Sequence, residues 1–231
     1  MTNNQPILIT GCGRSGASMV AEAFALCGAF TGGVDTFQEN IGINQVVESF
    51  LHAASYSDNC QYPLPETSSI LIPHNWATRV QTQLKLDGYT EGPWVYKGVN
   101  ITVLWPIWKY AFPNAKWVIV CRRTADIVSS YCKTNYKKTK WAFKNAENVK
   151  AVGGTTERDG WLWLVHQYER RFIEIMESGA DYKVVWPERM AFHDYGPMQD
   201  LIAWAGLQWN SDIVAKIGPK FQKTRKREGI I

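Results

Sequence analysis

A strand that runs into a glycine-rich turn and then a helix constrains the fold of this chain more than any other feature. Residues 7–10 (ILIT) form a short apolar, β-branched run, which is typical of a buried strand. From Ala17 to Cys27 the apolar residues recur at helical spacing, and Gly28 ends the pattern. The sequence therefore predicts a βα unit joined by a tight turn.

Strand and helix patterns continue to alternate along the chain. We expect further strands at residues 94–97, 116–121 and 182–186, and helices at residues 102–112, 124–136, 158–176 and 195–205. Thr124 is the expected N-cap of the second of these helices. This alternation favours an α/β fold of three layers, P-loop-like, with a central parallel sheet flanked by helices. The length of 231 residues suits one domain, residues 1–231.

The first turn has the composition of a phosphate cradle. Residues 11–18 read GCGRSGAS, which nearly satisfies the P-loop pattern of two glycines, Lys and Ser/Thr. Glycines let successive N–H groups point inward, and the N-terminus of the following helix adds its positive end. Ser15 and Ser18 can donate hydroxyl hydrogen bonds to the same phosphate. The alternative is a helix start that is glycine-rich by chance.

The P-loop lysine is missing from this turn. Ala17 stands in its place, and the nearby cation is Arg14. Phosphoryl transfer relies on that lysine together with Mg²⁺, and no acidic residue closes the strand at residues 116–121 to hold a metal. A cradle built from an arginine and backbone amides, without metal ligands, favours a donor whose transferred group carries less charge.

A second polar turn follows the strand at residues 116–121. Arg122 lies at the carboxyl end of that strand, and Ser130 lies eight residues later, about two helical turns on. In a parallel sheet both turns meet at the same edge, where ligands bind. The pair can bracket a second phosphate, although by itself it is equally explained as a surface arginine and a helix serine.

Together the two motifs resemble those of the sulfotransferases that use 3′-phosphoadenosine 5′-phosphosulfate (PAPS). The family opens with a strand and loop similar to ILITGCGRSGAS, and its second motif is similar to WVIVCRRTADIVSSY. The resemblance continues through FPNAKWVIVCRR, WLWLVHQYERR and AWAGLQWN, so it spans most of the chain. It implies the fold predicted above and transfer of a sulfuryl group to a hydroxyl, with release of 3′-phosphoadenosine 5′-phosphate (PAP).

The resemblance also implies roles for individual residues. The 5′-phosphosulfate would be held by Gly13, Arg14, Ser15, Gly16, Ala17 and Ser18. The 3′-phosphate would be held by Arg122 and Ser130, and closed over by a loose match to the family's basic C-terminal segment that includes Arg225 and Lys226. Lys97 ends the strand that carries a lysine near the sulfuryl group. The catalytic histidine of small-molecule members is absent, because Val99 occupies its position.

For the general base, the resemblance implies a carboxylate as the first choice. Relatives that use a carboxylate place a glutamate after the first helix, which selects Glu39, with Arg14 and Lys97 as the cations that stabilise developing charge. Glu39 is equally explained as an acid that precedes a helix at residues 43–51. Glu48 and His52 are the reserves, and His74, His166 and His193 show no partner in sequence.

Composition restricts the other classes of protein to which this chain could belong. Five cysteines without a CxxC spacing indicate reduced thiols, and no signal peptide or apolar span is present, so we expect a cytoplasmic protein without metal or membrane partners. The main rival function is a nucleotide or small-molecule kinase. Lysine-rich stretches leave a nucleic-acid-binding protein as a third reading. Most of the eleven tryptophans should be core residues, but they also hint at a carbohydrate or other small-molecule acceptor.

Overall fold

The sheet is parallel throughout and places the N-terminal strand in its middle. A computed structural model describes residues 6–134 and 141–220. Its strands are β1 (Pro6–Gly11), β2 (Trp94–Lys97), β3 (Lys116–Val120) and β4 (Asp181–Val185), in the order β2-β1-β3-β4. Ile9 pairs with Lys97 on one side and with Val118 on the other, both in parallel. The expected α/β fold is confirmed.

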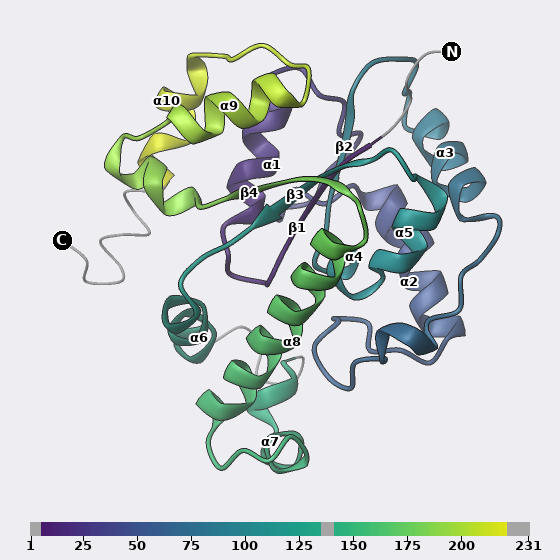
Figure 1. Cartoon of the computed structure of the whole chain (residues 1–231), viewed down its shortest axis with the longest axis vertical. Coiled ribbons are helices and arrows are strands. Elements are labelled where there is room, and N and C mark those ends of the chain that lie inside the picture. The colour runs from purple at the N-terminus through teal and green to yellow at the C-terminus, as the bar shows by residue number, and fades with distance from the viewer. Residues whose placement is uncertain (1–5, 135–140, 221–231) are drawn as a thin grey trace.

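The helices lie between successive strands or, for α9 and α10, after β4, and they cover both faces of the sheet (Figure 1). In chain order they are α1 (Ala17–Leu26), α2 (Ile41–Ala53), α3 (Trp76–Leu86), α4 (Val99–Val103), α5 (Trp105–Ala111), α6 (Thr124–Lys133), α7 (Ala146–Ala151), α8 (Glu157–Glu177), α9 (Gly196–Trp204) and α10 (Asp212–Lys216). Among the residues that the structure describes, no helix is both long and apolar enough to cross a membrane.

Alternating strand residues divide the interior into two cores. Ile7 and Ile9 of β1 point into a core shared with α1, α9 and α10, whereas Leu8 points into a core on the opposite face. This second core is the larger one and takes in residues of α2, α3, α4, α5, α6 and α8. Because side chains alternate across a strand, the two apolar faces produce three layers.

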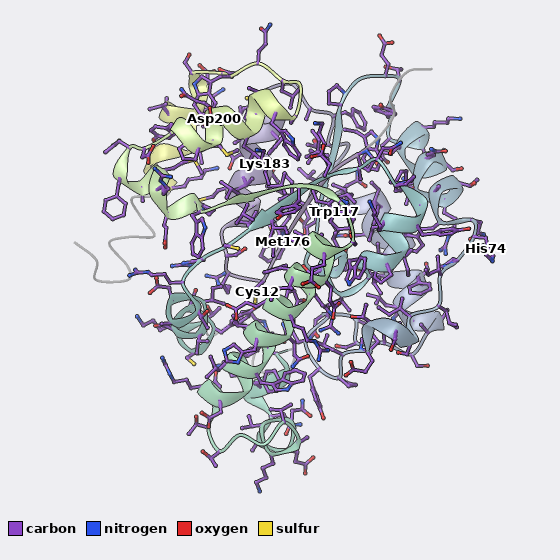
Figure 2. All side chains as sticks on the ribbon, viewed as in Figure 1. Cys12, His74, Trp117, Met176, Lys183 and Asp200 are labelled. Carbon is purple, nitrogen blue, oxygen red and sulfur yellow. The ribbon has the colours of Figure 1, made fainter. Side chains whose placement is uncertain are left out.

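Tryptophans form much of the larger core. Five of them are fully withdrawn from solvent: Trp76, Trp94, Trp108, Trp117 and Trp161. Figure 2 shows Trp117 near the middle of the molecule and His74 at its edge. The expectation that tryptophans are mainly core residues holds for these five.

Three local predictions need correction. Thr124 is the first residue of α6 rather than its N-cap, which is Arg123, and its hydroxyl donates to Glu169 instead. The same helix ends at Lys133, before residue 136, because Thr134 turns to extended backbone and its hydroxyl donates to the carbonyl of Ser130. The segment at residues 102–112 is two short helices, α4 and α5, and α3 was not anticipated.

The order of the strands creates a switch point between β1 and β3. The chain leaves β1 toward β2 on one side, and leaves β3 toward β4 on the other. The loops after these two strands therefore diverge and leave a crevice at the carboxyl edge of the sheet. The turn at residues 11–16 and Arg122 both lie at this edge.

Candidate active site at the carboxyl edge of the sheet

The loop between β1 and α1 is curled around its own backbone. Gly16 adopts a left-handed conformation with φ of 95°, and Arg14 does so with φ of 72°. The Ser15 N–H donates to the carbonyl of Cys12 at 3.0 Å, which closes the turn. Ala17 and Ser18 begin α1, so their N–H groups lack acceptors within the helix. The loop thus presents backbone donors at a helix N-terminus, as anion sites do.

Gly13 has no room for a side chain. A Cβ atom at this position would collide with the hydroxyl of Tyr131, which is buried on α6. The tyrosine cannot easily move, because its ring stacks on Trp161 with centroids 4.3 Å apart and an interplanar angle of 7°. The glycine therefore allows the loop to pass close to an aromatic wall.

Ser15 contributes a buried hydroxyl without a partner. The residue is 2% exposed, and its Oγ makes no hydrogen bond with any described residue. A buried hydroxyl without a partner costs free energy, about 1–3 kcal/mol in mutational data. A ligand oxygen in the cradle would supply the missing partner.

Arginines connect the second motif to this loop. Arg122 donates from Nη1 to the carbonyl oxygen of Arg14 at 2.9 Å, and Arg14 donates from Nε to Ser130 Oγ at 3.0 Å. The end of β3, the loop before α1 and the second half of α6 are thereby held together. The structure brings Arg14, Arg122 and Ser130 to one place, although Ser130 contacts Arg14 rather than lining the pocket itself.

An ion pair stands at the end of β2. Lys97 Nζ lies 2.6 Å from Glu39 Oε1, and the two side chains are only 7% and 17% exposed. The other carboxylate oxygen, Glu39 Oε2, accepts from Asn44 Nδ2 at 3.1 Å. Asn44 Oδ1 in turn accepts from the Tyr96 hydroxyl at 2.6 Å. Glu39 is therefore oriented by hydrogen bonds to both of its oxygens.

A short turn delivers Glu39 to this position. Asp35 Oδ1 accepts from the N–H groups of Phe37 and Glu39 at 2.8 and 2.9 Å. Asn40 follows as the N-cap of α2, and its Oδ1 accepts from the Ile43 N–H at 2.6 Å. Glu39 thus precedes the helix cap, and its side chain engages Lys97 instead of the helix terminus.

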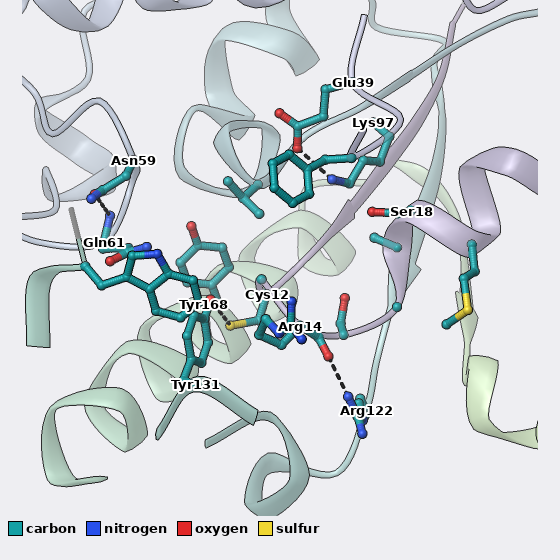
Figure 3. Close-up of a pocket in the computed structure, with 18 residues that line it drawn as sticks. Cys12, Arg14, Ser18, Glu39, Asn59, Gln61, Lys97, Arg122, Tyr131 and Tyr168 are labelled. Carbon is teal, nitrogen blue, oxygen red and sulfur yellow. Dashed lines mark hydrogen bonds and ion pairs between the residues drawn. The ribbon is translucent and has the colours of Figure 1, made fainter. Parts of the chain in front are cut away.

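The phosphate-type loop, Arg122 and the Glu39–Lys97 pair line one pocket of about 380 Å³. Figure 3 shows Ser18 and Arg122 on one side of Cys12, with Asn59, Gln61 and Tyr131 on the other, and Glu39 and Lys97 along the upper edge. The lining residues that the sequence predicted are Gly13, Arg14, Ser15, Gly16, Ala17, Ser18, Glu39, Lys97 and Arg122. Arg225 and Lys226 lie outside the described residues.

Sequence reasoning missed the other half of the pocket. Its lining also includes Phe37, Asn59, Gln61, Tyr131, Trp141 and Tyr168. Only two of these lie in a recognisable sequence pattern. Tyr131 directly follows Ser130 in the second motif, and Tyr168 belongs to the aromatic stripe of α8. The remaining four come from loops without periodicity.

Other candidate acids and bases lie elsewhere. Glu48 and His52 are exposed on α2, and His52 Nε2 lies 3.5 Å from Asp58 Oδ1. The three remaining histidines, His74, His166 and His193, are also exposed and do not line the pocket. Cys12 does line it, but burial raises the pKa of its thiol to about 12, so the thiol is protonated at neutral pH.

Comparison with known proteins identifies the architecture. No protein-family model matches the sequence, and no curated protein matches it. Among solved structures, the sulfotransferase domain of the curacin biosynthetic pathway matches with a TM-score of 0.56 at 10% identity, over 93% of this chain and 78% of that one. This chain has a sulfotransferase-like fold. The sulfotransferase domain of the Synechococcus olefin synthase agrees, with a TM-score of 0.53 at 12% identity and the same coverage.

A third sulfotransferase structure extends the likeness along the chain. The Mycobacterium avium enzyme matches with a TM-score of 0.52 at 11% identity, over 98% of this chain and 69% of that one. Identities this low establish the sulfotransferase-like fold alone.

Proposed function

We propose that this protein is a PAPS-dependent sulfotransferase that moves a sulfuryl group to a hydroxyl of a small-molecule or carbohydrate acceptor and releases PAP. The observation that carries the proposal is the Glu39–Lys97 pair, which lines the same pocket as the phosphate-type loop. A carboxylate and an ammonium beside an anion cradle are the groups that in-line transfer to an alcohol requires.

The residues of the cradle fit the donor. Ser15 Oγ is buried without a partner among the described residues, and the first N–H groups of α1 face outward from the helix. Arg14, Lys97 and Arg122 line the pocket, and Glu39 is its only acidic lining residue among those described. We propose that the loop holds the 5′-phosphosulfate, that Arg122 and Ser130 hold the 3′-phosphate, and that Arg225 and Lys226 close over it.

Glu39 and Lys97 divide the chemistry between them. When bound, the donor supplies an activated sulfuryl group whose S–O bond to phosphate breaks as the acceptor oxygen bonds to sulfur. Glu39 takes the proton from the acceptor hydroxyl. Lys97 has three N–H donors, so it can hold Glu39 and also stabilise the charge that develops on the departing phosphate oxygen. Arg14 adds a second positive charge at the loop.

Calorimetry with PAP tests the donor assignment directly. We expect PAP to bind saturably in the presence of EDTA. In a separate titration without EDTA, ATP–Mg²⁺ should bind at least about tenfold more weakly. The proposal fails if ATP–Mg²⁺ binds and PAP does not, and a kinase then becomes the better interpretation. It fails also if DNA or RNA binds with steep salt dependence while PAP is ignored.

A further inference from the structure

A chain of polar side chains leads from Glu39 into the larger core. It runs through Asn44 of α2 to Tyr96 of β2 and Asn100 of α4. We call Asn44, Tyr96 and Asn100 the polar network; Glu39 lines the pocket, whereas these three residues do not. Tyr96 is 1% exposed and Asn100 8%. Polar groups at such depth cost free energy unless they are paired, so their pairing fixes their geometry.

The donors along this network point toward Glu39. Asn100 Nδ2 donates to the Tyr96 hydroxyl oxygen at 3.0 Å, and that hydroxyl donates to Asn44 Oδ1 at 2.6 Å. Asn100 Oδ1 is a more distant acceptor for the same hydroxyl, at 3.2 Å. Because the Asn44 oxygen is engaged, its amide nitrogen faces Glu39 Oε2 and donates to it at 3.1 Å. The Tyr96 hydroxyl therefore determines the orientation of the Asn44 amide.

Two properties of Tyr96 keep this arrangement in place. Burial and, secondarily, the negative charge of Glu39 raise the pKa of the phenol well above its ordinary value, so the hydroxyl stays protonated and remains a donor. The ring stacks on Trp108, with centroids 5.1 Å apart and an angle of 29°. A ring packed in this way has little freedom to turn its hydroxyl away from Asn44.

The two carboxylate oxygens of Glu39 consequently have different partners. Oε1 is held by the Lys97 ammonium at 2.6 Å (Figure 3), and Oε2 by the neutral Asn44 amide at 3.1 Å. The ammonium opposes protonation of Oε1 most strongly, because it lies directly against that atom. A carboxylate oxygen accepts about two hydrogen bonds, so Oε2 can receive a second one. Oε2 is therefore the oxygen that we assign to proton transfer.

We propose that Asn44 is a positioning residue for this proton transfer and that Tyr96 acts through it. By holding Oε2, Asn44 sets the rotation of the Glu39 carboxyl group. Oε2 can then take the acceptor proton while the acceptor oxygen bonds to sulfur and PAP leaves with the electrons of the broken S–O bond. The inference rests on the proposed function and goes beyond it, because it assigns a role to residues outside the pocket.

A double-mutant cycle on turnover separates positioning from a structural role. Asn44→Leu removes the N–H donor in nearly the same shape, and Tyr96→Phe removes only the hydroxyl. The turnover number is measured as PAP released from PAPS, with methyl glucoside, 2-naphthol and 1-octanol supplied together as acceptors. We expect Asn44→Leu to lower it about tenfold and Tyr96→Phe at least about threefold, as for the loss of a hydrogen bond to a charged group.

The Glu39→Gln background provides the second side of the cycle. There, Asn44→Leu and Tyr96→Phe should each change the turnover number less than about twofold, because the base through which they act is already gone. PAP affinity, measured by calorimetry, should stay within about threefold of the wild-type value in every variant, which also shows that the variants are folded.

Thr67→Val is the matched control. The Thr67 hydroxyl donates to Glu174 Oε2 at 2.8 Å, so this change also removes a partly buried hydrogen bond to a carboxylate. Neither residue lines the pocket. The control variant should therefore keep the wild-type turnover number.

The outcomes separate this inference from the function on which it rests. The inference is wrong if Asn44→Leu and Tyr96→Phe leave turnover unchanged, or lower it by the same factor with and without Glu39. It is equally wrong if Thr67→Val lowers turnover as much as they do. In these cases PAP still binds and the sulfotransferase stands. If Asn44→Leu does not fold, Tyr96→Phe, which removes one oxygen atom, decides alone. If the wild-type protein neither binds PAP nor releases it from PAPS, the proposed function fails first.

Discussion

Lys97 and Glu39 form an ion pair at the carboxyl end of β2, with Lys97 Nζ 2.6 Å from Glu39 Oε1. The residues are 58 positions apart in sequence, one on the strand and the other on the turn before α2. Their exposed fractions of 7% and 17% place both charges largely out of water. Each charge in this poorly hydrated setting is stabilised by the other. Removing either side chain should therefore affect both the chemistry of the site and the stability of the fold.

Replacing the carboxylate should abolish transfer and spare donor binding. Glu39→Gln keeps the shape and can still accept from Lys97, but an amide cannot take the acceptor proton. We expect the turnover number to fall at least about 100-fold, in the range of general-base contributions, with PAP affinity changed less than threefold. Production of PAP from PAPS in the presence of an acceptor alcohol measures the first, and calorimetry the second. Glu48→Gln, on the exposed face of α2, is the control and should retain activity.

The same pair should show strong coupling in stability. Glu39→Gln and Lys97→Met each leave one largely buried charge without its partner, and we expect each to lower the free energy of unfolding by roughly 2–4 kcal/mol. The double variant leaves no unpaired charge and should recover part of that loss. Urea unfolding of the wild-type protein, the two single variants and the double variant completes the double-mutant cycle. Strict additivity of the two single effects would contradict this prediction.

Two adjacent arginines provide a matched test of the second motif. Arg122 lines the pocket, whereas Arg123 pairs with Asp126, Nε to Oδ2 at 2.7 Å, and approaches Glu188. Arg122→Ala should weaken PAP binding about tenfold or more, because a charged hydrogen bond contributes about 1.5–3 kcal/mol. Arg123→Ala should change it less than threefold. Equal losses in calorimetry would exclude a specific role for Arg122.

The close approach of Gly13 to Tyr131 predicts a rescue. Gly13→Ala would force its Cβ into the Tyr131 hydroxyl, and the ring cannot retreat from its stack on Trp161. We expect a loss of about 1–3 kcal/mol in unfolding free energy, as for other overpacked sites. Tyr131→Phe removes the hydroxyl and should restore most of the lost stability. Thermal or urea unfolding of the single and double variants measures this rescue. Failure of the rescue would place the strain in the loop backbone instead.

The buried cysteines predict a loss of stability at alkaline pH. Burial raises the thiol pKa of Cys12 and Cys60 to about 12, and that of Cys121 to about 11. In the unfolded chain these thiols titrate at about 8.5, so above that pH the unfolded state releases protons that the folded state retains. Their contribution is complete below pH ~8.5, and the free energy of unfolding should fall as pH rises toward the folded values.

Urea unfolding between about pH 8 and pH 10 measures this trend for the cysteines. Labelling with iodoacetamide at about pH 8 should spare Cys12 and Cys60 in the native protein and modify both in urea, because the thiolate is the reactive form. Rapid native labelling of either residue would contradict its burial.

Much of the fold could be predicted from the sequence because its signals are local. The apolar runs of β1 and β3 are buried on both faces of a parallel sheet, so each reads as a strand without reference to the rest of the chain. The glycines of the first turn and the position of Arg122 after β3 likewise place the phosphate-type loop and an arginine at the same edge. The break between α4 and α5 and the helix α3 were missed, since their tertiary packing overrides weak local patterns.

The sequence by itself determined the βα unit, the parallel sheet and the two polar turns that carry Arg14 and Arg122, whereas Glu39 and Lys97 became candidates through the resemblance to sulfotransferases. Only the tertiary structure decided that Glu39 pairs with Lys97, that Ser130 bonds Arg14, and that Gln61 and Trp141 complete the pocket. These contacts join segments tens of residues apart. They depend on strand order and on where irregular loops pack, and neither is encoded in hydrophobic periodicity along the chain.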